Sequence, residues 1–242
     1  MEFLFDVNAC CGFDRLGRVD ASLEAFWDLS KRVEVQKACI CSLKGAFYDY
    51  SEGNEETLRI CEGREELFPV ATLDPRRCWQ GEKEVKRLWQ RGFRLLRLFP
   101  ELQDWPYRYK PFMKILTGLA ERPLLLLLPI RDLGSLTELS HLIPPGAPFP
   151  VVLLGVGYRL LSEALSVLAE RERFYLETSR LCTPDAYELF SQELGSQRLL
   201  FGSGFPFTNP GAPAFALRQA LISTENKERI SHANLEGLLA KL

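Results

Sequence analysis

The chain has 242 residues, of which 46% are hydrophobic and 26% are charged, and this balance excludes an intrinsically disordered protein. Thirty lysines and arginines against 32 acidic residues give a net charge of −2, so no basic field is available to attract nucleic acid or a membrane surface. The longest apolar run, residues 124–128, is far below the ~20 residues of a membrane span, and no signal peptide is evident. We therefore expect a cytoplasmic protein whose seven cysteines are reduced thiols.

Short β-rich runs alternate along the chain with segments of helical periodicity. The predicted strands are residues 3–10, 36–43, 67–73, 93–99, 123–128, 150–154, 174–178 and 198–202. The predicted helices are residues 21–35, 54–66, 82–91, 111–121, 132–142, 160–171, 183–194, 214–222 and 225–242. Eight strands alternating with helices predict an α/β protein with a (β/α)₈ TIM barrel, formed as a single domain by residues 1–242.

The strands are nearly continuous hydrophobic runs, as at residues 124–128 and 151–154, which predicts burial on both faces. A doubly wound open sheet is the alternative, but residues 8–13 lack the glycine-rich turn that such a fold carries after its first strand. Hydroxyl residues are predicted to cap three helices. Thr183 precedes a proline, while Ser162, and Ser223 or Thr224, precede acidic residues.

Three segments, taken together and in order, resemble one known family. Residues 5–10 read Phe-Asp-Val-Asn-Ala-Cys, residues 198–206 read Arg-Leu-Leu-Phe-Gly-Ser-Gly-Phe-Pro, and the closing helix contains Ile230 and Asn234. These segments resemble the first strand, the eighth strand and the last helix of the amidohydrolase-related family (amidohydrolase 2 type), which are metal-dependent TIM-barrel hydrolases. The resemblance implies a TIM barrel with hydrolase or decarboxylase ancestry.

The resemblance also implies positions for the ligands of one or two divalent metals, and here most of them carry other residues. The first-strand pair falls on Asn8 and Cys10, the sixth-strand position on Gly155 and the eighth-strand position on Gly204, while the fifth-strand position falls on Leu128 or Pro129. The two histidines of the chain, at positions 141 and 232, lie in predicted helices away from these positions. We therefore expect a divergent member whose metal centre is lost, with no metal and no other cofactor.

Candidate functional residues are sought where the strands end, because barrel proteins assemble their sites at the carboxyl ends of the strands. A period of two places Asp6, Asn8 and Cys10 on one side of the first strand. Asp6 and Cys10 are weak catalytic candidates. Asp6 is either a buried hydrogen-bond acceptor or a base with a raised pKa, and a thiolate at Cys10 or Cys41 would lack a histidine partner.

Six residues are predicted to bind a ligand: Asn8, Cys10, Arg97, Glu177, Ser203 and Phe207. Arg97 ends the fourth strand, where a guanidinium suits a carboxylate or a phosphate, and no second basic residue is evident at a strand end. The alternative role of Arg97 is a salt bridge with Glu177. Aromatic residues in the loops after strands two, four and eight form either an apolar pocket or packing lids.

The sequence thus predicts a protein that binds a small molecule, preferably a carboxylate, at the mouth of the barrel. Such a protein would carry out metal-independent hydrolysis or no catalysis at all. A non-catalytic interaction protein is the main alternative, and an enzyme that uses cysteine thiolates, with or without a soft metal, is a third. The expected partner is a small-molecule ligand, and a homo-oligomer is compatible with the sequence.

Overall fold

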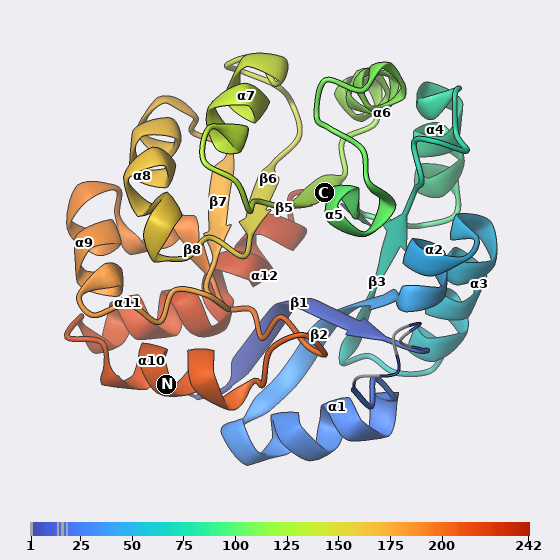
Figure 1. The fold of residues 1–242 in the computed structure, drawn as a ribbon. Coiled ribbons are helices and arrows are strands. Elements are labelled where there is room, and N and C mark those ends of the chain that lie inside the picture. Colours follow the sequence, from blue (N-terminus) through green and yellow to red (C-terminus); the bar gives the residue numbers. More distant parts are fainter. Residues whose placement is uncertain (1, 14, 16, 18) are drawn as a thin grey trace.

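A computed structural model describes residues 2–13, 15, 17 and 19–242, and within them eight parallel strands form one sheet in the order β1 to β8. Figure 1 shows the strands around a common centre with helices outside them. The strands are β1 (Leu4–Cys11), β2 (Val35–Ser42), β3 (Leu67–Thr72), β4 (Leu95–Arg97), β5 (Leu125–Pro129), β6 (Val151–Leu154), β7 (Phe174–Glu177) and β8 (Leu199–Leu200).

Backbone hydrogen bonds connect the first strand to the segment that follows the last. The amide of Val7 donates to the carbonyl of Phe201 at 3.0 Å, and that of Gly204 donates to the carbonyl of Asn8 at 3.0 Å. The amide of Cys10 donates to the carbonyl of Phe205 at 2.9 Å. The ring of strands is thereby closed, and the predicted TIM barrel, with all eight of its strands, is confirmed.

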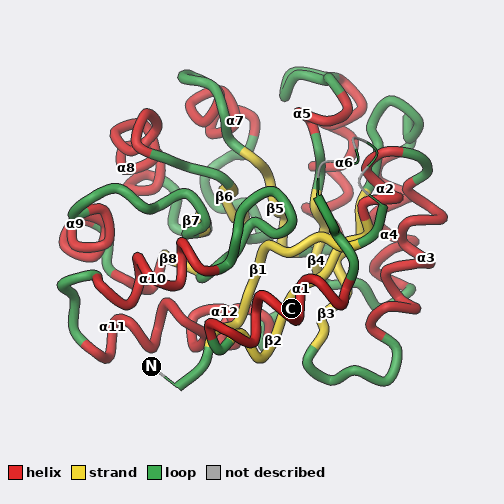
Figure 2. The backbone as a smooth tube through the Cα atoms, turned by 60° about the horizontal axis from the view of Figure 1, so that its bottom comes forward, coloured by secondary structure: helices red, strands yellow, loops and turns green. Residues whose placement is uncertain are grey.

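Helices follow the strands and cover the outside of the barrel (Figure 2). They are α1 (Leu23–Ser30), η1 (Lys31–Val33), α2 (Leu43–Phe47), α3 (Tyr50–Cys61), α4 (Gly81–Gln90), α5 (Pro100–Gln103), α6 (Lys110–Glu121), α7 (Ser135–Leu142), η2 (Tyr158–Leu160), α8 (Leu161–Glu170), α9 (Ala186–Glu193), η3 (Ser196–Arg198), α10 (Gly211–Gln219), α11 (Thr224–Glu228), η4 (Arg229–Ala233) and α12 (Asn234–Leu239). The sequence did not predict α2 or α5, because segments of five and four residues are too short to show a helical period.

The predicted helix caps have different outcomes. The prediction for Ser162 is wrong, because α8 already begins at Leu161. Ser223 caps α11 as predicted, since its side chain accepts from the amide of Asn226 at 3.2 Å. The prediction for Thr183 is wrong. Asp185 adopts a left-handed φ of 60°, which an α-helix cannot contain, so α9 begins only at Ala186.

Alternate residues of the strands pack on opposite faces, as predicted for strands buried on both sides. In β5, Leu125 and Leu127 belong to one hydrophobic cluster, and their neighbours belong to a second cluster that includes helix residues. Strand β1 departs from this alternation. Val7 and Cys10 lie in the same cluster, and the register between β1 and β2 shifts between Asp6 and Ala9. The predicted strict period of two through Asp6, Asn8 and Cys10 is therefore wrong, because an irregularity interrupts it.

No helix in the described part of the chain is long and apolar enough to cross a lipid bilayer.

Candidate functional site

A cavity of about 400 Å³ lies where the carboxyl ends of the strands meet, which is the usual place of a site in this fold. Its walls come from the strands β1, β4, β5 and β6 and from the segments that follow β4 to β8. The lining residues are Asn8, Arg97, Glu101, Pro129, Ile130, Arg131, Leu154, Gly155, Gly157, Tyr158, Arg159, Leu160, Ser179, Arg180, Gly204, Phe207 and Thr208.

Arg97 is the buried cation of this cavity, with only 6% of its surface exposed. Its Nη1 donates a hydrogen bond to Oδ1 of Asn8, and its guanidinium carbon lies 4.7 Å from the centre of the Phe99 ring. Its Nε is buried without a hydrogen-bond partner, and no ion pair joins Arg97 to a carboxylate among the described residues. A buried charged donor without a partner is costly, so this guanidinium suits an anion in the cavity.

Glu177 is fully buried at the end of β7, and its carboxylate does not pair with Arg97. The predicted salt bridge is therefore wrong. Glu177 instead accepts hydrogen bonds from the amide of Ser179, from Oγ of Ser179 at 3.0 Å and from the amide of Gly155 at 3.3 Å. Burial raises the pKa of Glu177 to about 7, although these three hydrogen bonds act in the opposite direction. Ser179 and Gly155 line the cavity, whereas Glu177 lies behind them.

Asp6 is also fully buried and does not line the cavity. Its Oδ1 accepts hydrogen bonds from the amides of Asn8 and Ser203, both at 2.9 Å, while its Oδ2 is buried without a partner. Burial raises the pKa of this carboxyl group. Ser203 is likewise buried, and its hydroxyl accepts from the amide of Phe205 at 3.0 Å. Both side chains hold the segment after β8 against β1.

The cysteine candidates lie in the barrel interior and do not line the cavity. Cys10 and Cys41 face one another in the register of β1 and β2, and both are buried. The hydrogen bond with Cys10, together with burial, raises the pKa of the Cys41 thiol. No histidine approaches them, because His141 is exposed on α7 and His232 stacks on Phe3 with a ring distance of 4.3 Å.

The positions that the resemblance assigns to metal ligands offer a poor donor set. Asn8 carries the one side-chain oxygen, and that oxygen already accepts from the cationic Arg97. Gly204 adopts a φ of +69°, and a Cβ built there would lie 3.1 Å from Oγ of Ser179, so a larger side chain would strain this turn. In the part of the chain that the structure describes, no three His, Cys, Asp or Glu side chains gather as a metal site. The residues present therefore do not fit a divalent metal.

Three further arginines line the cavity, so the expectation of a single basic residue at the strand ends is wrong. Arg131, Arg159 and Arg180 lie two, five and three residues beyond the ends of β5, β6 and β7. Because these arginines lie in loops, the periodicity of the strands does not reveal them. Their short distance from the strand ends is the signal that could have identified them. Glu101 is the one carboxylate among the lining residues, and burial raises its pKa.

Of the predicted ligand-binding residues, Asn8, Arg97 and Phe207 line the cavity, while Cys10, Glu177 and Ser203 lie behind its surface. The aromatic residues of the loops also form two groups, one exposed at the cavity and one buried. Phe207 is 39% exposed at the cavity, and Tyr158, which the sequence did not single out, is 75% exposed there. Trp105 and Tyr107 are buried and pack on Phe112, with ring distances of 5.3 and 6.0 Å, so they act as packing lids.

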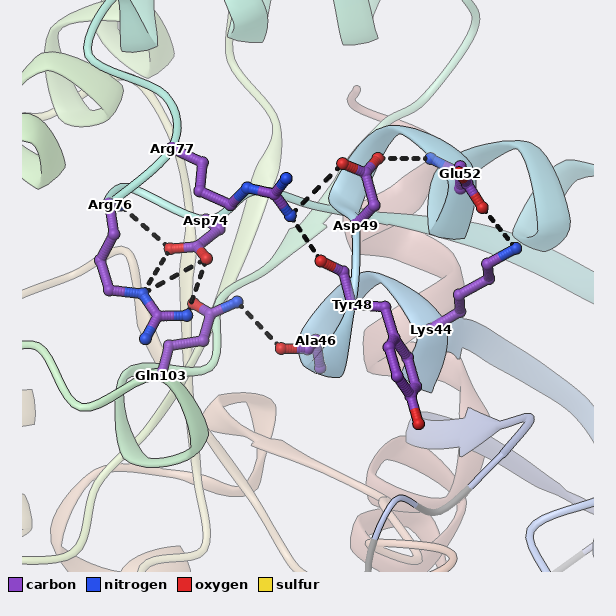
Figure 3. A network of polar contacts seen from close by, with 9 residues as sticks. All are labelled: Lys44, Ala46, Tyr48, Asp49, Glu52, Asp74, Arg76, Arg77 and Gln103. Carbon is purple, nitrogen blue, oxygen red and sulfur yellow. Dashed lines mark hydrogen bonds and ion pairs between the residues drawn. The ribbon is translucent and has the colours of Figure 1, made fainter.

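The loops after β2 and β3 form a different part of the mouth, shown in Figure 3. The carboxylate of Asp74 accepts from the amide, Nε and Nη2 of Arg76, at 2.8 to 3.3 Å. Arg77 donates to the carbonyl of Tyr48 at 2.5 Å and lies 3.4 Å from the carboxylate of Asp49. Each arginine here is paired with an acidic side chain. Arg76 stabilises the loop after β3, and Arg77 connects that loop to the loop after β2.

Comparison with known proteins agrees with the fold. A family model described as amidohydrolase matches residues 60–238. A protein from Staphylococcus aureus described as an amidohydrolase superposes with a TM-score of 0.77 at 14% identity, over 98% of this chain and 99% of that one. The 5-carboxyvanillate decarboxylase of Sphingomonas paucimobilis gives 0.76 at 12% identity, over 99% of both chains.

A dihydroxybenzoic acid decarboxylase from Polaromonas sp. JS666, solved with bound manganese and an inhibitor, gives a TM-score of 0.74 at 14% identity, over 99% of this chain and 97% of that one. Among curated proteins, none is similar enough to the chain to count as a relative. At identities this low, the solved structures establish the shared fold alone.

Proposed function

Since the chain belongs to the amidohydrolase family, we propose that it binds a small carboxylated molecule at the barrel mouth. The proposed site binds this molecule without a divalent metal. The observation that carries the proposal is Arg97. Its guanidinium is buried, lines the cavity and has a free Nε, while Asn8 is its one hydrogen-bond partner among the described side chains.

An arginine at this depth suits a carboxylate for two reasons. Its planar donors match the two carboxylate oxygens, and the surrounding protein excludes water that would weaken the attraction. Asn8 fixes one end of the guanidinium through its Oδ1 and thereby leaves the other donors to the ligand. The hydroxyl of Thr208 borders the same cavity and can donate to a bound oxygen.

Loss of the metal chemistry is supported by the donor set. Asn8, Gly155 and Gly204 stand where ligands would be expected, and one amide oxygen cannot replace several imidazoles and a carboxylate. The positive charge of Arg97 beside Asn8 further disfavours a cation at this place.

Metal-independent hydrolysis is a second candidate function, and Glu177 favours it. Its pKa of about 7 lets the carboxyl group take up or release a proton near neutral pH. Its hydrogen bond to Ser179 would pass such a proton to a hydroxyl at the cavity wall. A non-catalytic binding protein needs only Arg97 and the cavity. A cysteine-dependent enzyme has less support, because Cys10 and Cys41 are buried away from the cavity.

Binding of butyrate, followed by ligand-observed NMR titration, tests the proposal. Replacing Arg97 by Met keeps much of the side chain's packing and removes its donors, so affinity should fall by about 1.5–3 kcal/mol, at least tenfold. Arg94→Met is the matched control, because Arg94 donates to the carbonyls of Trp89 and Phe93 outside the cavity. Equal butyrate affinity in wild type and Arg97→Met would refute the proposed function, as would failure of the wild type to bind butyrate or any other small anion.

A further inference from the structure

We propose that the natural ligand carries at least two anionic groups, as a small polycarboxylate or phosphate compound does. This inference rests on the proposed function and specifies the ligand class of the same cavity. The observation behind it is the number of cations in one small space. Arg97 alone suffices for one carboxylate, yet three more arginines line the cavity.

These arginines come from consecutive parts of the barrel. Arg97 is the last residue of β4, and Arg131, Arg159 and Arg180 follow β5, β6 and β7 in turn. Because neighbouring parallel strands end side by side, the four arginines come from one arc of the barrel rather than from scattered points around it. Such an arc matches a ligand whose charges are spread over several atoms.

Hydrogen bonds and ion pairs to other described residues do not occupy the three outer arginines. Among the described residues, the side chains of Arg131, Arg159 and Arg180 make no hydrogen bond or ion pair. Nearby Arg108 shows the contrast, because its Nε lies 2.5 Å from the carboxylate of Glu138. Exposed arginines that are held in ion pairs serve the fold, whereas these three keep all five donors for a ligand.

The balance of charge in the cavity points the same way. Four arginines face a single carboxylate, Glu101, whose pKa is raised by burial and lowered again by Arg97 and Arg131. A concave surface with one sign of charge focuses the electric field and concentrates oppositely charged solutes. A monocarboxylate would neutralise only a small part of this charge.

The size and remaining lining of the cavity restrict the ligand to a compact molecule. A volume of about 400 Å³ lies at the small end of ligand pockets. Thr208 adds a hydroxyl donor, and Phe207 and Tyr158 add apolar surface. Arginine binds the oxygens of both carboxylate and phosphate groups, so both kinds of anion are tested.

Calorimetric titration at constant ionic strength, with butyrate, glutarate and tricarballylate, varies the charge on similar carbon chains. Inorganic phosphate and pyrophosphate form a parallel series. We expect affinity to rise at least tenfold from butyrate to tricarballylate, or from phosphate to pyrophosphate, and the series with the steeper rise identifies the source.

The triple variant Arg131→Gln, Arg159→Gln, Arg180→Gln should lose affinity for the preferred polyanion by at least tenfold more than it loses affinity for butyrate, because each butyrate carries a single charge. The matched control replaces three exposed arginines that do not line the cavity, Arg15, Arg32 and Arg59, by Gln. Thermal melts verify that both triple variants are folded.

The outcomes separate the two proposals. Affinity that does not rise with charge, or an equal loss in both triple variants, overturns the polyanion inference and leaves the proposed function intact. If neither butyrate nor any polyanion binds the wild-type protein, the proposed function fails and this inference fails with it.

Discussion

Two parts of the barrel mouth use arginine in opposite ways. On the side of β2 and β3, Arg76 is bound through three nitrogens to Asp74, and Arg77 lies beside Asp49 (Figure 3). On the side of β5 to β7, Arg131, Arg159 and Arg180 have no acidic partner within the described residues. The same residue type therefore holds loops together on one side and leaves its donors to the cavity on the other.

At one barrel mouth, arginines that stabilise loops therefore differ from arginines that are free to bind a ligand in whether an acidic side chain pairs with them. Arg76 pairs with a carboxylate that is itself buried, since Asp74 is only 5% exposed, and Arg77 pairs with the partly exposed Asp49. The unpaired arginines and Arg97 instead surround a cavity. The carboxylates of the two sides differ in the same way. Asp74 on the β3 side is paired with Arg76, whereas Glu177 on the β7 side is buried without a cation and its pKa is raised to about 7.

The largest effect is expected for Glu177. Because burial raises its pKa from 4.5 to about 7, its contribution to stability is present below pH 4.5 and is lost as the pH rises through 7. Relative to Glu177→Gln, the wild type should lose about 3 kcal/mol of unfolding free energy over this range. Urea titrations at several pH values measure the difference, with exposed Glu172→Gln as the control. Parallel pH profiles for wild type and Glu177→Gln would show that burial is not setting this pKa.

The next effect concerns the paired side of the mouth. Asp74→Ala removes the acceptor of several charged hydrogen bonds, and the half-exposed position of Arg76 reduces the loss to about 1–2 kcal/mol of unfolding free energy. Anion affinity should stay at the wild-type value, because Asp74 does not line the cavity. Asp28→Ala, at an exposed position of α1, is the control. A loss of anion binding without a loss of stability would reverse the roles assigned to the two sides.

A smaller effect, a coupling energy near zero, is expected when Arg97 and Glu177 are replaced together, because no ion pair joins them. The double variant Arg97→Met, Glu177→Gln should destabilise the protein by the sum of the single changes, within about 0.5 kcal/mol. Chemical denaturation of the three variants and the wild type gives the coupling energy. Recovery of stability in the double variant beyond this margin would mean that the two charges interact.

The smallest effect is expected for Arg131→Gln. Because Arg131 makes no ion pair among the described residues, the unfolding free energy should change by less than about 0.5 kcal/mol. Arg76→Gln, the corresponding change on the paired side, should cost about 1 kcal/mol. Equal losses in the two variants, measured by urea denaturation, would remove the distinction between paired and unpaired arginines.

The sequence was sufficient to predict the barrel because its strands carry an unambiguous pattern. Runs such as residues 124–128 are hydrophobic at consecutive positions, which both faces of a buried parallel strand require. Arg97 and Asn8 were found for a related reason. They lie within or at the end of strands, and the strand directions place them at the mouth.

Other features of the site could not be predicted, because they depend on contacts between residues that the periodicity of the sequence does not reveal. Glu177 was predicted to bind a ligand, with a salt bridge to Arg97 as the alternative, but Ser179, two residues further on, supplies a local amide and hydroxyl that satisfy the carboxylate. Arg131, Arg159 and Arg180 lie in loops, whose paths follow from tertiary packing rather than from local pattern. The irregularity in β1 likewise has no signature in its residue types.

The central claim is that an arginine site, rather than a metal, binds anions at this barrel mouth. It is tested most directly by NMR titration of untagged protein with butyrate, after treatment with a chelating resin and again after addition of one equivalent of Zn²⁺ or Mn²⁺. The account predicts saturable binding to the metal-free protein, with the same affinity after either metal is added. Binding that occurs only in the presence of Zn²⁺ or Mn²⁺ would contradict it.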